Sequence, residues 1–317
     1  MSQGLGVYAY AGIGVQSAYG TAVAGAIWAE IKGESMKGTR PRIPVGVLGS
    51  RSLKRTVKGQ ADVAGGLSFP MQWNGLESFL KHAFGSVSTS GAGPYTHTFA
   101  LAAQLPAPGL TVLVNRDAAN VGTGSMFRYV GCHISKLTLG QKINEVMMVD
   151  AEFIGSDYGN VNIQAATFPT WDPIEYGQMT VANFDQAGTP YGMKIREWQL
   201  VIDNKIEPTR RLTDYKSAGA QVQDQREVTF MADIEFDSLT AWASFRDATE
   251  EDYQFKWVSS TRSLTIDIPK AYLTGDEPET SGPGPYYLKL NGRCTTETDD
   301  NEEIGLALVN STAGAIA

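Results

Sequence analysis

The sequence has few of the residues that metal sites, disulfide frameworks and membrane spans require. It holds 3 histidines and 2 cysteines in 317 residues. Cys132 and Cys294 lie far apart and form no disulfide pattern, so a reduced cytosolic chain is the simpler interpretation. No apolar run reaches the ~18 residues that a membrane-spanning helix needs. The first ten residues lack a basic segment before an apolar core, so we expect no secretory signal.

The sequence also lacks recognisable catalytic and phosphate-binding motifs. There is no Gly-x-Ser-x-Gly elbow and no Cys-x-x-Cys pair. Residues 12–14 contain two glycines but not the third that a dinucleotide-binding turn needs. Cys132 and His133 are adjacent on an expected strand and point to opposite faces, so they do not bind one metal together. We expect no enzyme activity, no cofactor and no metal site.

Charge is sparse, and its sign differs between the two halves of the chain. Residues 1–158 hold 13 Lys and Arg against 9 Asp and Glu, which gives +4. Residues 159–317 hold 13 against 25, which gives −12. A nucleic-acid-binding protein would be basic overall, so the split indicates a charged face or interface instead.

Strand patterns are abundant. Leu67, Phe69, Met71 and Trp73 alternate with polar or small residues, which is the period of a half-buried strand. Similar patterns predict further strands over 129–139, 145–154, 198–203, 228–236, 253–258, 264–268 and 286–290. Helices are few: 75–84, capped by Asn74, and 238–247, capped by Asp237.

The two strand–helix units look like copies separated by 163 residues. At this offset Leu67 falls on Phe230, Asn74 falls on Asp237, and Leu76 falls on Leu239. A repeat this long suggests a duplicated domain, since solenoid repeats span ~20–50 residues. Leu239 is expected to face inward, as Leu76 does. We predict a mainly β chain with domains over 1–165 and 180–317. The linker over 166–179 lies within a longer join, 155–192, that is rich in Gly, Pro, Asn, Asp and Thr.

A basic segment over 32–58 stands out from the rest. Two prolines and several glycines argue against a helix, so we expect a long loop, which in a compact domain is usually functional or disordered. Aromatic residues are absent from it, so base stacking is not indicated. A solvated loop and a loop that docks on an acidic surface both fit the composition. An acidic run over 297–303 has the opposite charge.

The order of several short segments resembles that of tail tube proteins of long-tailed bacteriophages. The segments are Gly20-Thr21-Ala22, the basic loop, the unit ending at Phe84-Gly85, Tyr95-Thr96-His97-Thr98-Phe99, and residues 198–204, 228–236 and 264–269. The likeness covers nearly the whole chain and rests on their order, because no single motif is diagnostic. Some family members add an immunoglobulin-like C-terminal domain, whereas the second half here looks like another tube domain.

The resemblance implies two tandem β-sandwich or barrel domains, each with one flanking helix and a long loop. It implies a structural virion protein, made in the host cytoplasm, that assembles into stacked rings through which the genome is delivered to the host. Six tube domains form a ring in this family, so two domains per chain imply a homotrimer and one implies a homohexamer. Expected partners are tail terminator, distal tail and tape-measure proteins, and DNA passes through without specific binding.

Two groups of residues are the candidate sites under this resemblance. Alternating acids on expected strands could serve as carboxylate pairs for acid–base chemistry or form a solvated face, and the solvated face is favoured; a tube would turn it to the channel. The expected channel-facing acids are Asp150, Glu152, Asp233 and Glu235. The expected contacts between rings are Lys37, Arg40, Arg42, Arg51, Lys54 and Arg55.

Two other functions fit the same profile. A capsid-decorating or head–tail connector protein would also be β-rich and glycine-heavy without forming long tubes. A carbohydrate-binding β-sandwich would use exposed aromatic residues, but several tryptophans here lie in core-like patterns.

Overall fold

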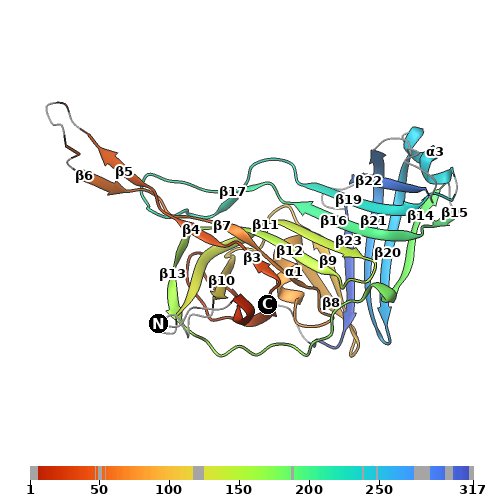
Figure 1. Ribbon diagram of the computed structural model, residues 1–317, viewed down its shortest axis with the longest axis horizontal. Coiled ribbons are helices and arrows are strands. Elements are labelled where there is room, and N and C mark those ends of the chain that lie inside the picture. The colour runs from red at the N-terminus through yellow and green to blue at the C-terminus, as the bar shows by residue number, and fades with distance from the viewer. Residues whose placement is uncertain are drawn as a thin grey trace.

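Most of the described chain is β-strand, as Figure 1 shows. The computed structural model describes residues 6–46, 48, 52–53, 55–116, 125–186, 189–237, 239–247, 249–274, 286–296 and 303–313. The mainly β fold class predicted from the alternating patterns is confirmed.

The first half contains the elements up to β13. Its strands are β1 (Tyr10–Val15), β2 (Ile27–Glu30), β3 (Gly33–Glu34), β4 (Lys37–Thr39), β5 (Arg42–Val45), β6 (Arg55–Lys58), β7 (Asp62–Pro70), β8 (Gly85–Ser90), β9 (Tyr95–Leu101), β10 (Leu110–Asn115), β11 (Ser125–Lys142), β12 (Met148–Gly155) and β13 (Asp157–Asn162). Its helices are the 3-10 turn η1 (Gly6–Tyr8) and α1 (Glu77–Phe84).

The second half follows with its own set of elements. Its strands are β14 (Met179–Gln186), β15 (Thr189–Gly192), β16 (Ile195–Asp203), β17 (Ile206–Pro208), β18 (Ala220–Val222), β19 (Glu227–Glu235), β20 (Glu250–Ser259), β21 (Arg262–Thr274), β22 (Tyr287–Cys294) and β23 (Gly305–Asn310). Its helices are the 3-10 turn η2 (Tyr176–Gln178) and α3 (Thr240–Arg246).

One antiparallel sheet, here called the long sheet, runs through both halves of the chain. Its order is β3 and β4, then β7, β12, β11, β16, β19 and β22. The halves meet where residues 136–142 of β11 pair with residues 197–203 of β16. Backbone hydrogen bonds of a single sheet therefore join the two halves.

A second antiparallel sheet, the outer sheet, also crosses from one half to the other. Its order is β8, β9, β23, β21, β20, β14 and β15. The last strand, β23, lies between β9 of the first half and β21 of the second. A third group, β2, β1, β10, the first part of β11 and β13, completes the first half.

The strand pairings recur in the same order in the two halves. β1 pairs with β2 and β10 as β14 pairs with β15 and β20. β11 pairs with β10, β12 and β13 as β21 pairs with β20, β22 and β23. The helices begin at Glu77 and Thr240, 163 positions apart, which matches the offset in the sequence. The β8–β9 hairpin has no counterpart, and the domain boundaries at 165 and 180 stay a prediction.

Apolar side chains of the long sheet pack inward against different partners in each half. In the first half, Phe69 of β7 lies against Phe79 of α1, with ring centroids 5.4 Å apart. In the second half, Trp198 of β16 lies 5.2 Å from Trp257 and 5.4 Å from Phe255 of the outer sheet. All five side chains are buried. The apolar residues whose alternation predicted the strands are therefore residues of the core.

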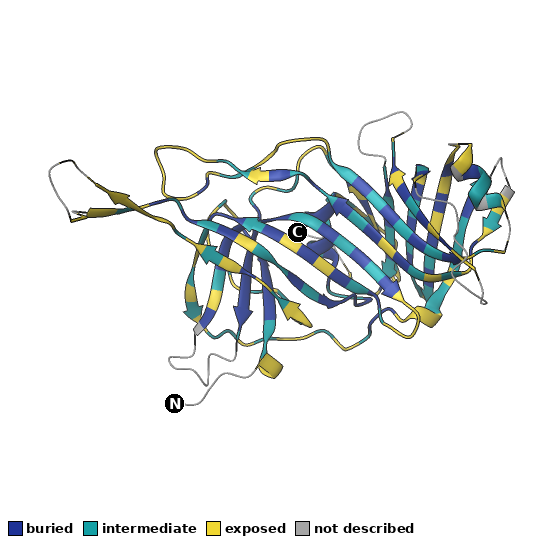
Figure 2. Ribbon diagram, turned by 45° about the horizontal axis from the view of Figure 1, so that its top comes forward, coloured by how far each residue is buried: buried dark blue, intermediate teal, exposed yellow. Residues whose placement is uncertain are grey.

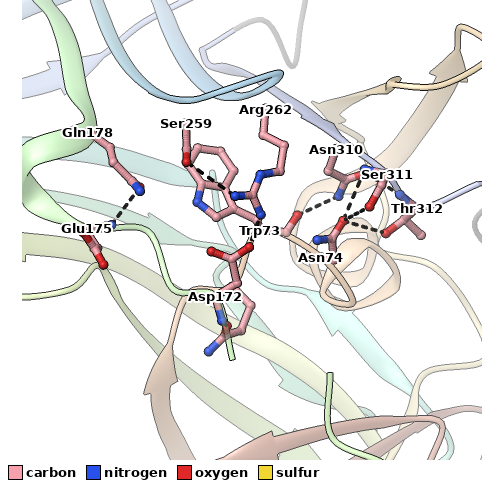
Figure 3. A network of polar contacts seen from close by, with 11 residues as sticks. Trp73, Asn74, Asp172, Glu175, Gln178, Ser259, Arg262, Asn310, Ser311 and Thr312 are labelled. Carbon is pink, nitrogen blue, oxygen red and sulfur yellow. Dashed lines mark hydrogen bonds and ion pairs between the residues drawn. The ribbon is translucent and has the colours of Figure 1, made fainter. Parts of the chain in front are cut away.

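A polar network fastens the first half, the connecting segment and the C-terminal strand together (Figure 3). The Asn310 side chain donates to the Trp73 carbonyl at 2.8 Å and to Glu77 at 2.5 Å. Arg262 pairs with Asp172 of the connecting segment, and its guanidinium lies 5.4 Å from the Trp73 ring centroid. These partners are distant in sequence, so the network links segments that only the tertiary fold brings together.

Three local expectations from the sequence were wrong. Asn74 does not cap α1; the cap position is Leu76, and the Asn74 side chain instead accepts hydrogen bonds from Ser311. Leu239 is 64% exposed rather than inward-facing. Residues 32–58 form β3, β4 and a β5–β6 hairpin where a loop was expected; the proline in β5 is tolerated because this pair has no third strand.

We expect Asn310→Ala to lower the free energy of unfolding by at least ~2 kcal/mol, because the carboxylate of Glu77 and the Trp73 carbonyl lose a buried donor. Urea denaturation followed by tryptophan fluorescence measures the change. The control is Asn160→Ala on β13, where the exposed side chain should matter by less than ~0.5 kcal/mol. Equal losses in both variants would contradict the role given to the network.

Candidate functional site

The four acids predicted to act together lie on one solvent-facing side of the long sheet. Asp150 and Glu152 of β12 alternate with buried Val149, Ala151 and Phe153. On β19, two strands beyond β11, the other two acids alternate in the same way with buried Ala232 and Ile234. The structure therefore brings all four to the same face, which we call the acidic face.

The acidic face carries further charges that sequence reasoning missed. Its additional acids are Asp62, Glu197, Asp203 and Glu227. Its bases are Lys37, Lys136, Lys142, Lys289 and Arg293, and Lys194 and Lys205 also reach its acids. With the four predicted acids, eight acids face seven bases, so the face is weakly negative. These neighbours follow from the strand pairing, which local sequence patterns do not reveal: Lys136 lies opposite Glu152 and Asp203, and Lys289 lies opposite Asp233.

Some carboxylates on this face are paired and others are not. Lys142 lies 2.8 Å from Glu197, and Lys205 lies 2.6 Å from Asp203. Among the residues that the structure describes, Asp150, Glu152 and Asp233 take part in no ion pair, whereas Glu235 lies 3.9 Å from Lys194. Ion pairs this exposed contribute little to stability. The three acids without an ion pair are available to repel an approaching anion.

The predicted basic residues of 32–58 divide between the body and a projecting hairpin. Arg40 lies 3.6 Å from Asp157 of the body, and Lys37 lies on β4 beside β7. Arg42 and Arg55 lie on the β5–β6 hairpin, here called the first arm, and point to no acid within ion-pair distance in the described part of the chain. Two predicted contacts, Arg51 and Lys54, lie outside the described residues.

The first arm extends away from the body and is exposed along its length (Figure 2). Ile43 is 51% exposed, Val45 is 39% exposed, and Leu53 is 58% exposed. A lone two-stranded hairpin is marginally stable in water, and it here presents apolar and basic side chains together. These properties are typical of a segment that is covered by a partner.

The titratable side chains in the interior lie in packed or hydrogen-bonded surroundings. His97 is buried and lies 2.9 Å from the Thr89 hydroxyl and 3.1 Å from the Asn310 side-chain oxygen. Burial raises the pKa of the Cys132 thiol to about 12 and also raises that of Cys294. Burial, with a smaller contribution from the charge of His82, lowers the pKa of His133 to about 4.

Metal and membrane features are absent from the residues that the structure describes. In that part of the chain, no three His, Cys, Asp or Glu side chains are placed to hold a metal ion. No described helix combines the length and apolar character needed to cross a membrane. The acidic face and the first arm stay the candidate sites.

Comparison with known proteins decides the family. A family model described as phage tail tube protein matches residues 8–294. The chain belongs to the phage tail tube protein family. The match confirms the resemblance inferred from the order of the short segments, and it ends before β23. A search of curated proteins found no match. Tail tube proteins are structural components of the phage tail, so this chain is a structural tail protein.

The low pKa of His133 should make the tail tube protein less stable as the pH falls from 6.5 toward 4. In the unfolded chain His133 takes a proton near pH 6.5, whereas the buried ring takes one only near pH 4. The stability that neutral His133 contributes is therefore complete above pH 6.5 and is lost progressively as the pH falls from 6.5 to 4. We expect wild type to lose up to ~1.4 kcal/mol per pH unit relative to His133→Gln in this window.

Urea unfolding of both proteins between pH 7 and pH 4.5 measures this difference. Carboxylates titrate in the same range, but they are common to the two proteins and cancel in the comparison. Parallel stability curves for wild type and variant would contradict the buried neutral state of His133.

Proposed function

We propose that this tail tube protein self-assembles into stacked rings that form a conduit for genome delivery. The observation that carries the proposal is the pairing of β11 with β16. Within one chain, two repeats of the same strand order stand edge to edge in one continuous sheet. The same joint, made between chains, would extend the long sheet into a closed barrel, and closure removes the exposed edges that otherwise cause aggregation.

Both ends of the long sheet offer partners for such a joint. At one end β3 and β4 pair with β7 alone among the described strands. At the other end, the last residues of β21 extend the long sheet beyond β22. Of these, Leu273 and Thr274 pair with β22 alone in the described part of the chain. β21 is the counterpart of β11, and β3 with β4 is the counterpart of β16. The end of β21 would therefore receive β3 and β4 of the next copy.

The ring that follows contains three chains. Six tube-like repeats in a ring require three copies when each chain supplies two, which gives a homotrimer with pseudo-sixfold symmetry. The repeated pairing order supports this stoichiometry over a homohexamer. No enzymatic step is needed, and the ends of the tube would contact tail terminator, distal tail and tape-measure proteins in a virion assembled in the host cytoplasm.

Purified protein should form rings with a central hole, and native mass spectrometry should give three times the chain mass of 34.2 kDa for a single ring. Negative-stain images should also contain tubes built from stacked rings. A six-chain ring would contradict the two-repeat interpretation, and monomers at all concentrations would contradict self-assembly. Knobs bound to capsids in place of tubes would indicate a decorating protein.

The acidic face is proposed to line the channel. A conduit must let duplex DNA slide, and unpaired carboxylates repel phosphates while offering them no binding site. The long sheet supplies the needed surface because its other side is buried in the core.

The first arm is proposed to contact other copies, including those of the adjacent ring, and its deletion should leave soluble protein that forms no tubes.

Charge reversal of the channel acids should slow DNA ejection from assembled particles. We expect Asp150, Glu152, Asp233 and Glu235 changed together to Lys to slow it at least ~10-fold, because lysines in the lumen would bind phosphates. Fluorescent detection of released DNA measures the rate in particles whose tubes are intact by microscopy. A matched control reverses four acids outside the long sheet: Glu175, Glu250, Asp252 and Asp267. Equal ejection rates in both sets would contradict the assignment.

A further inference from the structure

The second half has its own hairpin at the position that corresponds to the first arm. This second arm, residues 206–222, leaves β16 and returns to β19, as the first arm leaves β4 and returns to β7. β17 and β18 form its base, and Thr209 and Ala218 continue the hydrogen bonding outward. In Figure 1 it runs over the first half toward β4 and β7. The second arm is tied to the first half by contacts that the structure describes, whereas Arg42 and Arg55 of the first arm have no such partner among the described residues.

The second arm is held to the first half by charged and backbone contacts. Arg210 lies 3.0 Å from Asp62, and Lys216 lies 2.8 Å from Asp157. The backbone N–H of Ala61 donates to the Tyr215 carbonyl at 2.8 Å. Basic side chains of the arm thus meet acids at the start of β7 and the start of β13.

The equivalent surface of the second half is an open groove. Its volume is about 550 Å³, and it is lined by Asp224 and Glu227 at the start of β19, by Arg293 at the end of β22, and by Glu303 just before β23. These places correspond to the start of β7, the end of β12 and the start of β13. In the first half, Arg210 and Lys216 of the second arm contact acids of that surface. In the second half the groove stays open among the described residues, and Ile206 and Val222, at the base of the second arm, form part of its wall.

We propose that the first arm of a second copy of this chain docks in this groove. The docking presupposes the proposed ring, because it repeats between chains the contact that the second arm makes within one. The joint between β21 and the next copy's β3 and β4 would deliver the first arm to this place, just as the joint between β11 and β16 delivers the second arm to the first half.

Charge and apolar surface on the two sides are complementary. The first arm carries Arg42, Arg55 and Lys58 without a described acidic partner. The groove supplies Asp224, which takes part in no ion pair among the described residues, and beside it Glu303, which lies 3.4 Å from Arg226. Opposite charges of this kind fix register and partner choice.

Apolar side chains complete the match. Ile43 and Val45 of the arm are exposed, while Leu105, Ile206 and Val222 line the groove, with Val222 itself 54% exposed. Docking would remove these exposed apolar groups from water, which supplies the free energy that charge pairs at a rim do not.

Cysteine cross-linking tests the contact directly. Val45→Cys on the arm is combined with Val222→Cys in the groove, and assembled protein is treated with a short bis-maleimide. We expect covalent dimers and trimers on a denaturing gel. The control pair joins Val45→Cys to Val7→Cys, which is 82% exposed on η1, and should give neither. Single variants report any reaction of the buried native Cys132 and Cys294.

A charge swap provides a second, independent readout. Arg42→Glu should raise the protein concentration needed for assembly by ~10-fold or more, because it places like charges in contact. Asp224→Lys in the same chain should restore assembly. Rings or tubes that form without Val45–Val222 cross-links, or a swap that does not rescue, would overturn the docking and leave the tube function standing. Absence of rings from the unmodified protein would instead overturn the proposed function.

Discussion

Backbone hydrogen bonding between β11 and β16 is the constraint on which the rest of the molecule depends. Because this joint makes one sheet of two repeats, it fixes which side of the chain faces solvent across the whole long sheet. It also places the second arm over the first half, where Arg210 meets Asp62. A linker alone would leave the halves free to rotate; a shared sheet gives them one orientation and one curvature.

The two faces of the long sheet differ in what they contribute: the inward face forms the core, and the outward face carries charge. The inward face holds Trp198, Phe230 and Phe69 in a continuous core. The outward face carries charged side chains whose removal would cost little stability, since exposed groups away from packed sites contribute little. The charge of this face can therefore change without loss of the fold. The first arm shows the converse, since its exposed apolar residues Ile43 and Val45 add little to the stability of a single chain.

Local patterns predicted most elements but not their long-range partners. The alternation around Leu67 and the offset between Glu77 and Thr240 are visible in sequence because burial repeats every second residue in a strand and helices begin at matched positions. The predicted Asn74 cap was wrong because the Asn74 side-chain oxygen instead accepts a hydrogen bond from Ser311, far along the chain. The groove beside Asp224 could not be predicted, because it exists only once β19, β22 and the segment before β23 come together.

The position of β23 has a consequence for the strength of the outer sheet. Its Leu306 and Leu308 are buried between β9 and β21, and its Asn310 satisfies groups near α1. Loss of this strand would open a seam between β9 of the first half and β21 of the second. The two halves therefore share one outer sheet only while β23 is in place.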